Sequence, residues 1–239
     1  MSGPGVSMKL RDRSIVNGMS SPRLSTTAVA VLGLLGIRSM TGYEITQSAQ
    51  RTYRWLWPRE DSVLYEQPRR LQDKGLVTSA QEDGLRRQRT RYTITAEGRE
   101  AVAAWLATPA DAHFDWEPAV RLILADQGRH DDLLATLRAI RDWALEGIRD
   151  GIPVAEAILD GTSPFPDRAS LSGMNAVFVS DLLLTVHHWA EAALEEMQHW
   201  SSPTDDAGRD GWRELLRQRV ERGRALLAER ADPGDDERR

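Results

Sequence analysis

The sequence predicts a mostly α-helical protein: an N-terminal winged helix-turn-helix with a two-stranded β wing, followed by a C-terminal α-helical dimerisation domain. Three observations predict this fold. Helix-capping residues precede apolar residues at helical spacing between residues 25 and 75. Two short strand-like segments then flank an acidic turn, and the second is rich in arginine. After a short linker near residue 110, the remaining patterns are all helical.

The first two helices are predicted from their caps. Ser25 or Thr26 can cap a helix that contains the ten-residue apolar run 28–37. A buried strand would also fit that run, but its length and alanine content favour a helix. Thr41 is predicted to cap a second helix that ends near Thr52, with Glu44 as its capping-box partner.

The third helix and the wing follow. Asp61 or Ser62 is predicted to open a helix that ends at Gly75, because glycine is the common residue after a helix C-terminus. Residues 76–80 and 89–95 are predicted strands joined by a turn at 81–85, which makes a basic hairpin. Thr95 then caps a fourth helix, which Pro109 closes.

The C-terminal half is predicted to be helical at 117–127, 131–150, 172–200 and 212–229, with a short helix at 154–159 inside a Pro- and Gly-rich stretch. The helix at 172–200 carries two apolar stripes, one containing Phe178 and the other Leu183, so we expect it to be buried against two neighbours. The predicted organisation is a disordered tail (1–23), the winged domain (24–108), the helical domain (109–230) and a second disordered tail (231–239).

Composition separates two halves of the chain. Residues 1–107 hold 16 Lys and Arg against 10 Asp and Glu, whereas residues 108–239 hold 15 against 26, so only the first half is suited to phosphates. The absence of cysteine excludes disulfides and thiolate metal sites. The longest uninterrupted apolar run is too short to span a bilayer, and the N-terminus lacks the apolar core of a signal peptide, so we expect a cytoplasmic protein.

Four motifs resemble those of the PadR family of bacterial transcriptional regulators. They are L-G-L-L-G at 32–36, T-G-Y-E-I at 41–45, L-Y followed by R-R-L-x-x-x-G-L-V at 64–77, and R-x-R-Y-x-I-T-x-E-G at 89–98. The resemblance covers residues 24–107. It implies a winged helix-turn-helix that binds DNA, and a C-terminal helical region that forms a homodimer.

The third helix departs from the family pattern at two positions. Glu66 stands where the family has proline, and Pro68 stands where it has leucine. A proline inside a helix removes a backbone hydrogen bond and clashes with the preceding turn, which costs roughly 3 kcal/mol. We therefore expect this helix to be kinked near Leu64 or to begin late.

The candidate DNA-binding residues lie on the third helix and on the wing. Alternation along the strand puts Arg87, Arg89 and Arg91 on one face, where they could bind phosphates or simply form a solvated charged edge. Of Arg69 and Arg70, one is expected to face DNA and the other to pair with Glu66 or Asp73. The resemblance implies that Ser62 and Tyr65 lie near the phosphate backbone. The full set is Ser62, Val63, Tyr65, Gln67, Arg69, Arg70, Arg86, Arg87, Arg89 and Arg91, with Val63 and Gln67 as candidate base readers.

Other site types have less support. Trp143, Trp189 and Trp200 are a candidate effector pocket, although large rings more often fill gaps in helix packing. Glu196 and His199 form a single E-x-x-H pair, which is too few ligands for a di-iron site, so we expect no metal and no cofactor. The chain has no nucleophile elbow, phosphate-binding loop or dinucleotide fingerprint, so we expect no enzymatic activity.

The sequence thus favours a homodimeric repressor that binds double-stranded DNA at a palindromic operator and responds to an unknown small-molecule effector. The alternative is a non-enzymatic module that binds a protein or a small molecule and keeps the winged-helix fold with weak DNA affinity. Glu66, Pro68 and the acidic C-terminal half favour this alternative.

Overall fold

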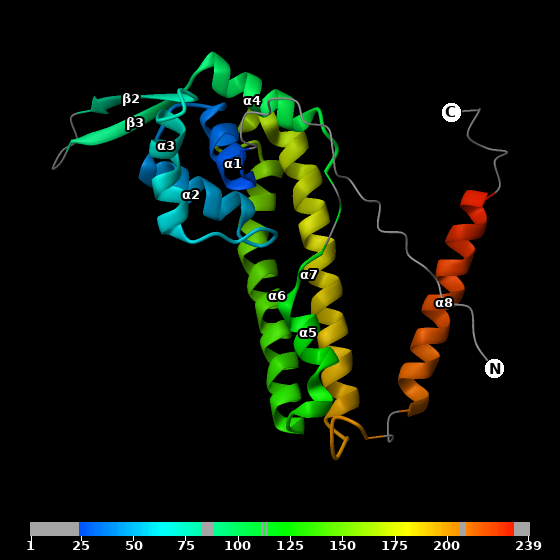
Figure 1. Cartoon of the computed structure of the whole chain (residues 1–239). Coiled ribbons are helices and arrows are strands. Elements are labelled where there is room, and N and C mark those ends of the chain that lie inside the picture. The colour runs from blue at the N-terminus through cyan, green and yellow to red at the C-terminus, as the bar shows by residue number, and fades with distance from the viewer. Residues whose placement is uncertain (1–23, 83–87, 111, 113, 206–208, 232–239) are drawn as a thin grey trace, which may run out of the picture. The chain divides into compact units, whose positions relative to one another are not determined.

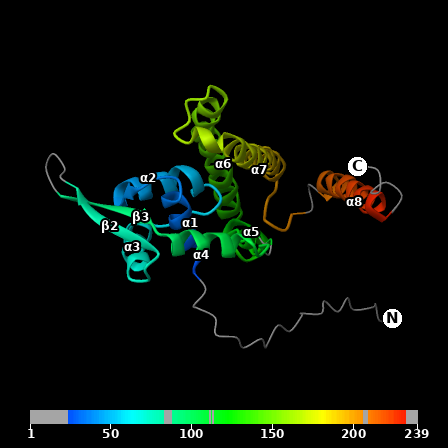
Figure 2. The ribbon, with the colours of Figure 1, turned by 90° about the horizontal axis from the view of Figure 1, so that it is seen from above.

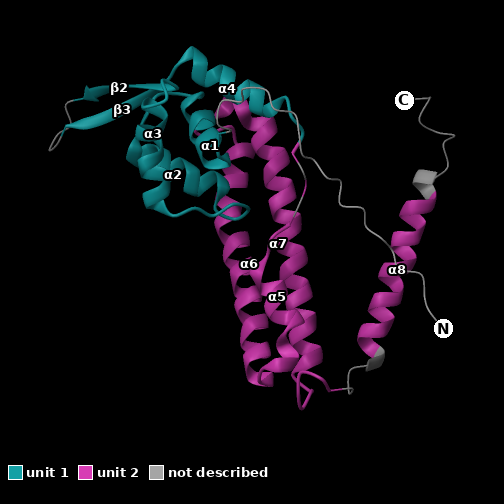
Figure 3. Ribbon diagram, viewed as in Figure 1, with its two compact units in different colours: residues 1–109 teal, residues 110–239 magenta. Residues whose placement is uncertain are grey.

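The computed structural model describes residues 24–82, 88–110, 112, 114–205 and 209–231 (Figure 1). The chain divides into two compact units, residues 1–109 and 110–239 (Figure 3). Both predicted tails and the predicted turn of the wing fall outside the described residues, apart from Ala231 at the end of the last helix and residues 81 and 82 at the start of the turn.

Unit 1 is a winged helix-turn-helix, which confirms the predicted N-terminal fold. Three helices precede a β-hairpin, and the hairpin projects beyond α2 and α3 (Figure 1). A fourth helix follows the hairpin. The elements are α1 (Thr26–Leu35), β1 (Met40–Thr41), α2 (Gly42–Tyr53), α3 (Asp61–Gln72), β2 (Val77–Glu82), β3 (Arg89–Ile94) and α4 (Ala96–Leu106).

Local capping fixes where three of these helices begin. The Ala28 amide donates to Ser25 Oγ at 3.2 Å, so Ser25 caps α1, and the strand alternative for this segment is wrong. Thr41 and Glu44 form the predicted capping box at the start of α2. Thr95 caps α4 by accepting from the Gly98 amide at 3.1 Å. After α3, Gly75 has a φ of +71°, a left-handed conformation that glycine adopts without strain.

The sheet has three strands, one more than expected. Its order is β1-β3-β2, and both pairings are antiparallel. The hairpin β2–β3, called the wing below, was predicted, but the two-residue strand β1 was not, because such a strand leaves no alternating pattern to detect. In the sheet, Thr41 lies opposite Arg91, which anchors β3 beside the start of α2.

The helix α3 begins at Asp61, so the late start expected from Pro68 is wrong. The helix continues through Pro68, whose ring is fully buried in the domain. Proline thus occupies a core position where the family has leucine. Burial of the ring offsets part of the cost of the missing backbone hydrogen bond.

The core of unit 1 is built around α1. Six of its ten residues are buried hydrophobics, and α1 contacts α2, α3, α4 and β3. Helix α4 closes the domain at Gly98, where an added Cβ would lie 2.2 Å from the carbonyl oxygen of Leu76. This close approach requires glycine, and it brings the two motifs at 64–77 and 89–98 into direct contact.

Unit 2 is helical, as predicted, but two of its helices are divided differently from the prediction, and the last two begin three residues earlier than expected. Residues 130–159 form one helix, although a break was expected at Gly151 and Pro153. Helix α6 packs along α7 and stays helical across the proline. The first predicted helix is instead divided in two. The elements are α5 (Glu117–Ile123), η1 (Ala125–Gln127), α6 (His130–Leu159), η2 (Pro166–Arg168), α7 (Ala169–Met197) and α8 (Arg209–Ala231).

Helices α6 and α7 lie side by side along their length (Figures 1 and 2). Within one chain, only Leu183 and Ala190 of α7 are buried, whereas Phe178 is 58% exposed. The expectation that α7 is buried against two neighbours is therefore wrong for the single chain. The residues of η2 and α7 together are long and apolar enough to cross a membrane, which is weak evidence because helices that pack in soluble proteins pass the same test.

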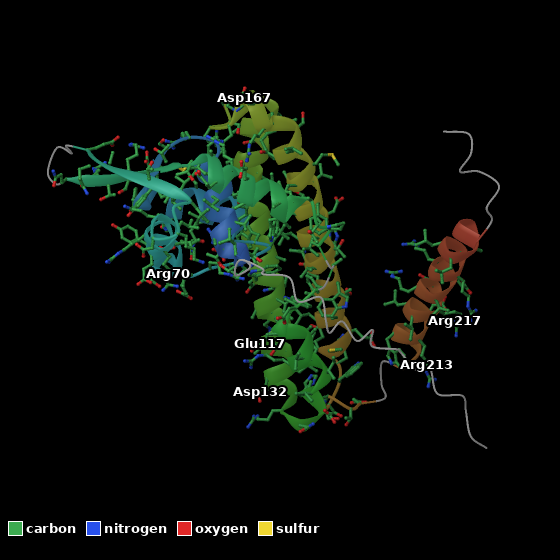
Figure 4. The ribbon with its side chains drawn as sticks, turned by 45° about the horizontal axis from the view of Figure 1, so that its top comes forward. Arg70, Glu117, Asp132, Asp167, Arg213 and Arg217 are labelled. Atoms are coloured by element: carbon green, nitrogen blue, oxygen red, sulfur yellow. The ribbon has the colours of Figure 1, made fainter. Side chains whose placement is uncertain are left out.

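Helix α8 carries charged side chains, among them Arg213 and Arg217 (Figure 4). Its described side chains, residues 211–228, are all exposed. Trp212, Leu216 and Val220 recur at helical spacing among them, so this helix also has an apolar stripe without a partner in the described chain.

Candidate nucleic-acid interface

Helices α2 and α3 enclose an open groove of about 630 Å³, called the α2–α3 groove below. Gln50 fastens the two helices together, because its Nε2 donates to Asp61 Oδ1 at 2.7 Å and to the Arg59 carbonyl at 2.9 Å. Both predicted backbone-contacting residues, Ser62 and Tyr65, lie in this groove. Its lining residues are Tyr43, Thr46, Gln47, Gln50, Arg51, Asp61, Ser62 and Tyr65.

The residues of α2 that line the groove were not predicted from the sequence. Tyr43, Gln47 and Arg51 are exposed and follow one another at four-residue spacing on one face of the helix. Gln47 Nε2 donates to the Tyr43 hydroxyl at 2.6 Å, which fixes both side chains at the groove. The spacing of these polar residues on the second helix of the motif was the signal that could have found them.

The Tyr65 ring packs against the start of α2, where a glycine leaves space for it. A Cβ at Gly42 would lie 3.0 Å from the Tyr65 ring, so this glycine allows the ring to pack against the start of α2. The ring nevertheless stays 62% exposed. Burial and the neighbouring Tyr65 raise the pKa of Tyr92 on β3, and the positive charge of Arg69 opposes that shift. The charges of Tyr65 and Arg69 on α3 therefore act on Tyr92 of the wing.

The two arginines of α3 differ in their partners. Arg70 donates to Glu66 at 2.9 Å, which is the predicted pairing across four residues, and it lies at the outer surface of the helix (Figure 4). The pair offsets the negative charge that Glu66 brings to this face, although such exposed pairs contribute little to stability. Arg69 is exposed and lies near Tyr92, so it is the better placed of the two to reach a phosphate.

The two candidate base readers also differ. Val63 is 41% exposed on the outer face of α3, where it can contact another molecule. Gln67 is only 9% exposed and faces the core. Helical geometry explains this, because Gln67 follows the buried Leu64 by three residues and precedes the buried Leu71 by four. A base contact by Gln67 does not fit this geometry.

Two of the four predicted wing arginines, Arg89 and Arg91, lie in the described part of the chain. Arg86 and Arg87 lie outside the described residues. Arg89 is exposed. Arg91 is half-buried, and its guanidinium donates to Glu82 at 2.5 Å and to Glu44 at 3.0 Å. The two arginines that alternation places on one face therefore have different surroundings.

Of the three predicted effector-site tryptophans, Trp189 has a described aromatic neighbour in unit 2. Trp189 lies edge-on to Trp116, with ring centroids 6.3 Å apart, and Trp116 lies next to Phe114 at 6.1 Å. Trp143 and Trp200 are each half-buried. Within the described part of the chain, no group of three or more His, Asp and Glu side chains could hold a metal ion.

These features define a protein of the winged helix-turn-helix class with a polar groove and exposed arginines beside its third helix. Residues 31–104, within unit 1, match the model of the family described as "Transcriptional regulator PadR-like family", which confirms the resemblance seen in the sequence.

Three comparisons with known proteins agree with this assignment. The chain is 30% identical over 78 residues to the Negative transcriptional regulator PadR of Bacillus subtilis, an alignment that spans 32% of this chain and 43% of that relative. The crystal structure of B. subtilis PadR in complex with operator DNA superposes with a TM-score of 0.59 at 18% identity, over 70% of this chain and 96% of that one. The complex of the same protein with p-coumaric acid gives 0.51 at 17% identity, over 74% and 99%.

Proposed function

We propose that this protein is a DNA-binding transcriptional regulator whose unit 1 reads double-stranded DNA. The observation that carries the proposal is the α2–α3 groove of a winged helix-turn-helix, together with exposed Arg69 on the third helix and exposed Arg89 on the wing. Hydroxyl and amide groups such as those of Tyr43, Gln47 and Ser62 donate to phosphate oxygens, and arginine adds charge. The third helix would enter the major groove with Val63 toward the bases, while the wing contacts the flanking backbone.

The working form would be a homodimer on a palindromic operator. Two winged domains related by a two-fold axis match a palindrome, and this requires a self-complementary interface. The unpartnered apolar residues of unit 2 supply such a surface. Met174, Val177 and Phe178 of α7 are all more than half exposed in one chain, and exposed apolar patches commonly mark interfaces.

Regulation would be negative and responsive to a small molecule. The B. subtilis relative is named a negative regulator, and its structure has been determined with a phenolic acid bound. In this chain, the Trp189–Trp116 pair provides flat aromatic surface in unit 2. An effector bound there could change the distance between the two third helices of the dimer. It would do so only if it bound two arrangements of the dimer with different affinities. We place the protein in the cytoplasm, where its DNA would be, and assign it no enzymatic activity.

Fluorescence anisotropy tests DNA binding directly. The full-length protein is titrated onto a duplex from upstream of its own gene and onto a scrambled duplex, across a salt series. We expect preference for the native duplex and a steep fall of affinity with salt, because phosphate contacts release counterions. Arg69→Gln should lower the log–log slope by roughly 0.9, the value for one phosphate contact. Arg121→Gln removes an exposed charge from α5 and should leave the slope unchanged.

The alternative function is a protein- or small-molecule-binding module with weak DNA affinity. The burial of Gln67 and the pairing of Arg91 with two carboxylates favour it, because both remove candidate DNA contacts. If the folded protein binds no duplex at low salt, the DNA-binding proposal fails and this alternative stands. Equal, salt-sensitive binding to both duplexes would show a general DNA-binding surface, and the operator would then be sought elsewhere.

A further inference from the structure

Arg91 lies at the centre of the three-stranded sheet. Its Cα partners are Thr41 on β1 and Ala80 on β2, so it stands where the wing joins the start of α2. Arg89, two residues earlier on the same strand, pairs only with β2 and lies farther out along the wing. The two arginines therefore share a strand but differ in their neighbours.

The Arg91 guanidinium is held from three directions. Its Nε donates to Glu82 Oε1 at 2.5 Å, and its Nη1 donates to the Ser39 carbonyl and to Glu44 Oε2, each at 3.0 Å. These bonds use three of the five N–H groups of the side chain. Their acceptors come from β2, from the segment before β1 and from α2, so a single side chain links three parts of the domain.

Glu44 links the Arg91 side chain to the N-terminal cap of α2. Its Oε2 also accepts from the Thr41 amide at 2.7 Å, and its Oε1 accepts from Arg38 at 3.4 Å. Burial acts to raise the pKa of Glu44, but the hydrogen bonds from Thr41 and Arg38 and the charge of Arg91 outweigh it and lower that pKa. Glu44 is therefore an anion at neutral pH, and it attracts Arg91 toward the helix.

We propose that Arg91 is a positioning residue, which fixes the wing relative to α2 and the α2–α3 groove, and that Arg89 is the residue that contacts phosphate. The second half of this statement rests on the DNA-binding function proposed above. With two carboxylates against one guanidinium, and with its side chain 28% exposed, Arg91 offers DNA little free positive charge. A phosphate could bind it only by displacing partners that already match its geometry.

Conservative and neutral variants at the two positions separate the roles. Lysine keeps the charge, and a point charge suffices for a phosphate, but lysine cannot reproduce three directed bonds. In the anisotropy salt series, Arg89→Gln should lower the log–log slope by roughly 0.9 while Arg89→Lys keeps it. Arg91→Gln and Arg91→Lys should both weaken binding at least threefold and leave the slope unchanged.

A second measurement needs no DNA. Amide hydrogen exchange in the free protein should become faster by a factor of ten or more at the β1–β3 pairing and in the wing of Arg91→Gln. The same amides in Arg89→Gln should exchange as in the unaltered protein. Glu82→Ala, which removes one acceptor of Arg91, should give an intermediate acceleration and keeps the test available if Arg91→Gln does not fold.

The outcomes distinguish this proposal from the proposed function. Faster exchange in Arg91→Gln together with no DNA binding by the unaltered protein would support the positioning role and reject the DNA-binding function. A slope lowered by Arg91→Gln and restored by Arg91→Lys would overturn the positioning role and make Arg91 a phosphate contact. Unchanged exchange, affinity and slope in Arg91→Gln would also overturn it.

Discussion

The two units of this chain differ in how completely a single copy buries its apolar residues. In unit 1, α1 buries six of ten residues, and every motif that resembles the PadR family contributes to packing. In unit 2, α7 buries two of 29 residues, and residues 211–228 of α8 are all exposed. Because apolar burial is the main driving force of folding, unit 1 has a buried core in one copy, whereas unit 2 leaves most of the apolar surface of α7 for a partner.

The motifs of unit 1 act as contacts between elements that are distant in sequence. The glycine of the motif at 89–98 packs on Leu76 of the motif at 64–77. Glu44 of the motif at 41–45 pairs with Arg91 of the motif at 89–98. These residues are therefore needed for the fold of the domain, and the candidate DNA-binding side chains lie on the surface that they support.

The largest expected effect comes from Gly98. In Gly98→Ala, the new methyl group would meet the Leu76 carbonyl and Ile94, so the backbone must shift, and overpacking of this kind costs about 3 kcal/mol. Calorimetry should show a lower midpoint temperature of unfolding for unit 1 and an unchanged one for unit 2. Gly33→Ala is the matched control, because its added Cβ meets nothing within 4 Å. A Gly98→Ala variant as stable as the control would refute the close contact.

A smaller effect is expected on the association of unit 2. Phe178→Ser removes a ring that is 58% exposed in one chain and would be buried in the dimer. Loss of that burial should raise the dimer dissociation constant about tenfold or more, since burying such a side chain contributes roughly 1.5–3 kcal/mol. Sedimentation equilibrium measures it, with Leu106→Ser in unit 1 as the control. Equal dissociation constants for the two variants would place the interface elsewhere.

The smallest expected effect is on the stability of unit 1 at acidic pH. Because the pKa of Glu44 is lowered in the folded protein, its ionised form stabilises unit 1 above its ordinary pKa of 4.5, and this contribution is lost as the pH falls through the lower folded value. Urea unfolding at pH 7 and pH 3.5 should show a smaller pH-dependent loss in Glu44→Gln than in the unaltered protein. The difference should be under about 1 kcal/mol for a partly exposed group. Glu100→Gln, on the exposed side of α4, should keep the full loss.

The sequence predicted those features of the fold that depend on neighbouring residues. Ser25, Thr41 and Thr95 cap helices as expected, and Gly75 ends α3, because each acts within about four residues of its own position. Continuous helices through Pro68 and Pro153 were not predicted, because packing against other elements outweighs the local preference.

The candidate site was predictable only in part, for a similar reason. Ser62 and Tyr65 share the α2–α3 groove, but the α2 residues opposite them were missed. Alternation placed Arg89 and Arg91 on one face of the strand, but it could not show that Glu44, 47 residues away, pairs with just one of them. The burial of Gln67 likewise depends on the side of α3 that faces α1.

Selection of bound sequences from a random duplex pool tests the central claim most directly, because it requires no knowledge of the operator. The full-length protein should enrich an inverted repeat whose half-sites are separated by one helical turn or a multiple of it, since a two-fold dimer presents two equal readers. Arg69→Gln should weaken the enrichment. A well-folded protein that enriches no sequence, or a single half-site without symmetry, would contradict the account of a dimeric DNA-binding regulator.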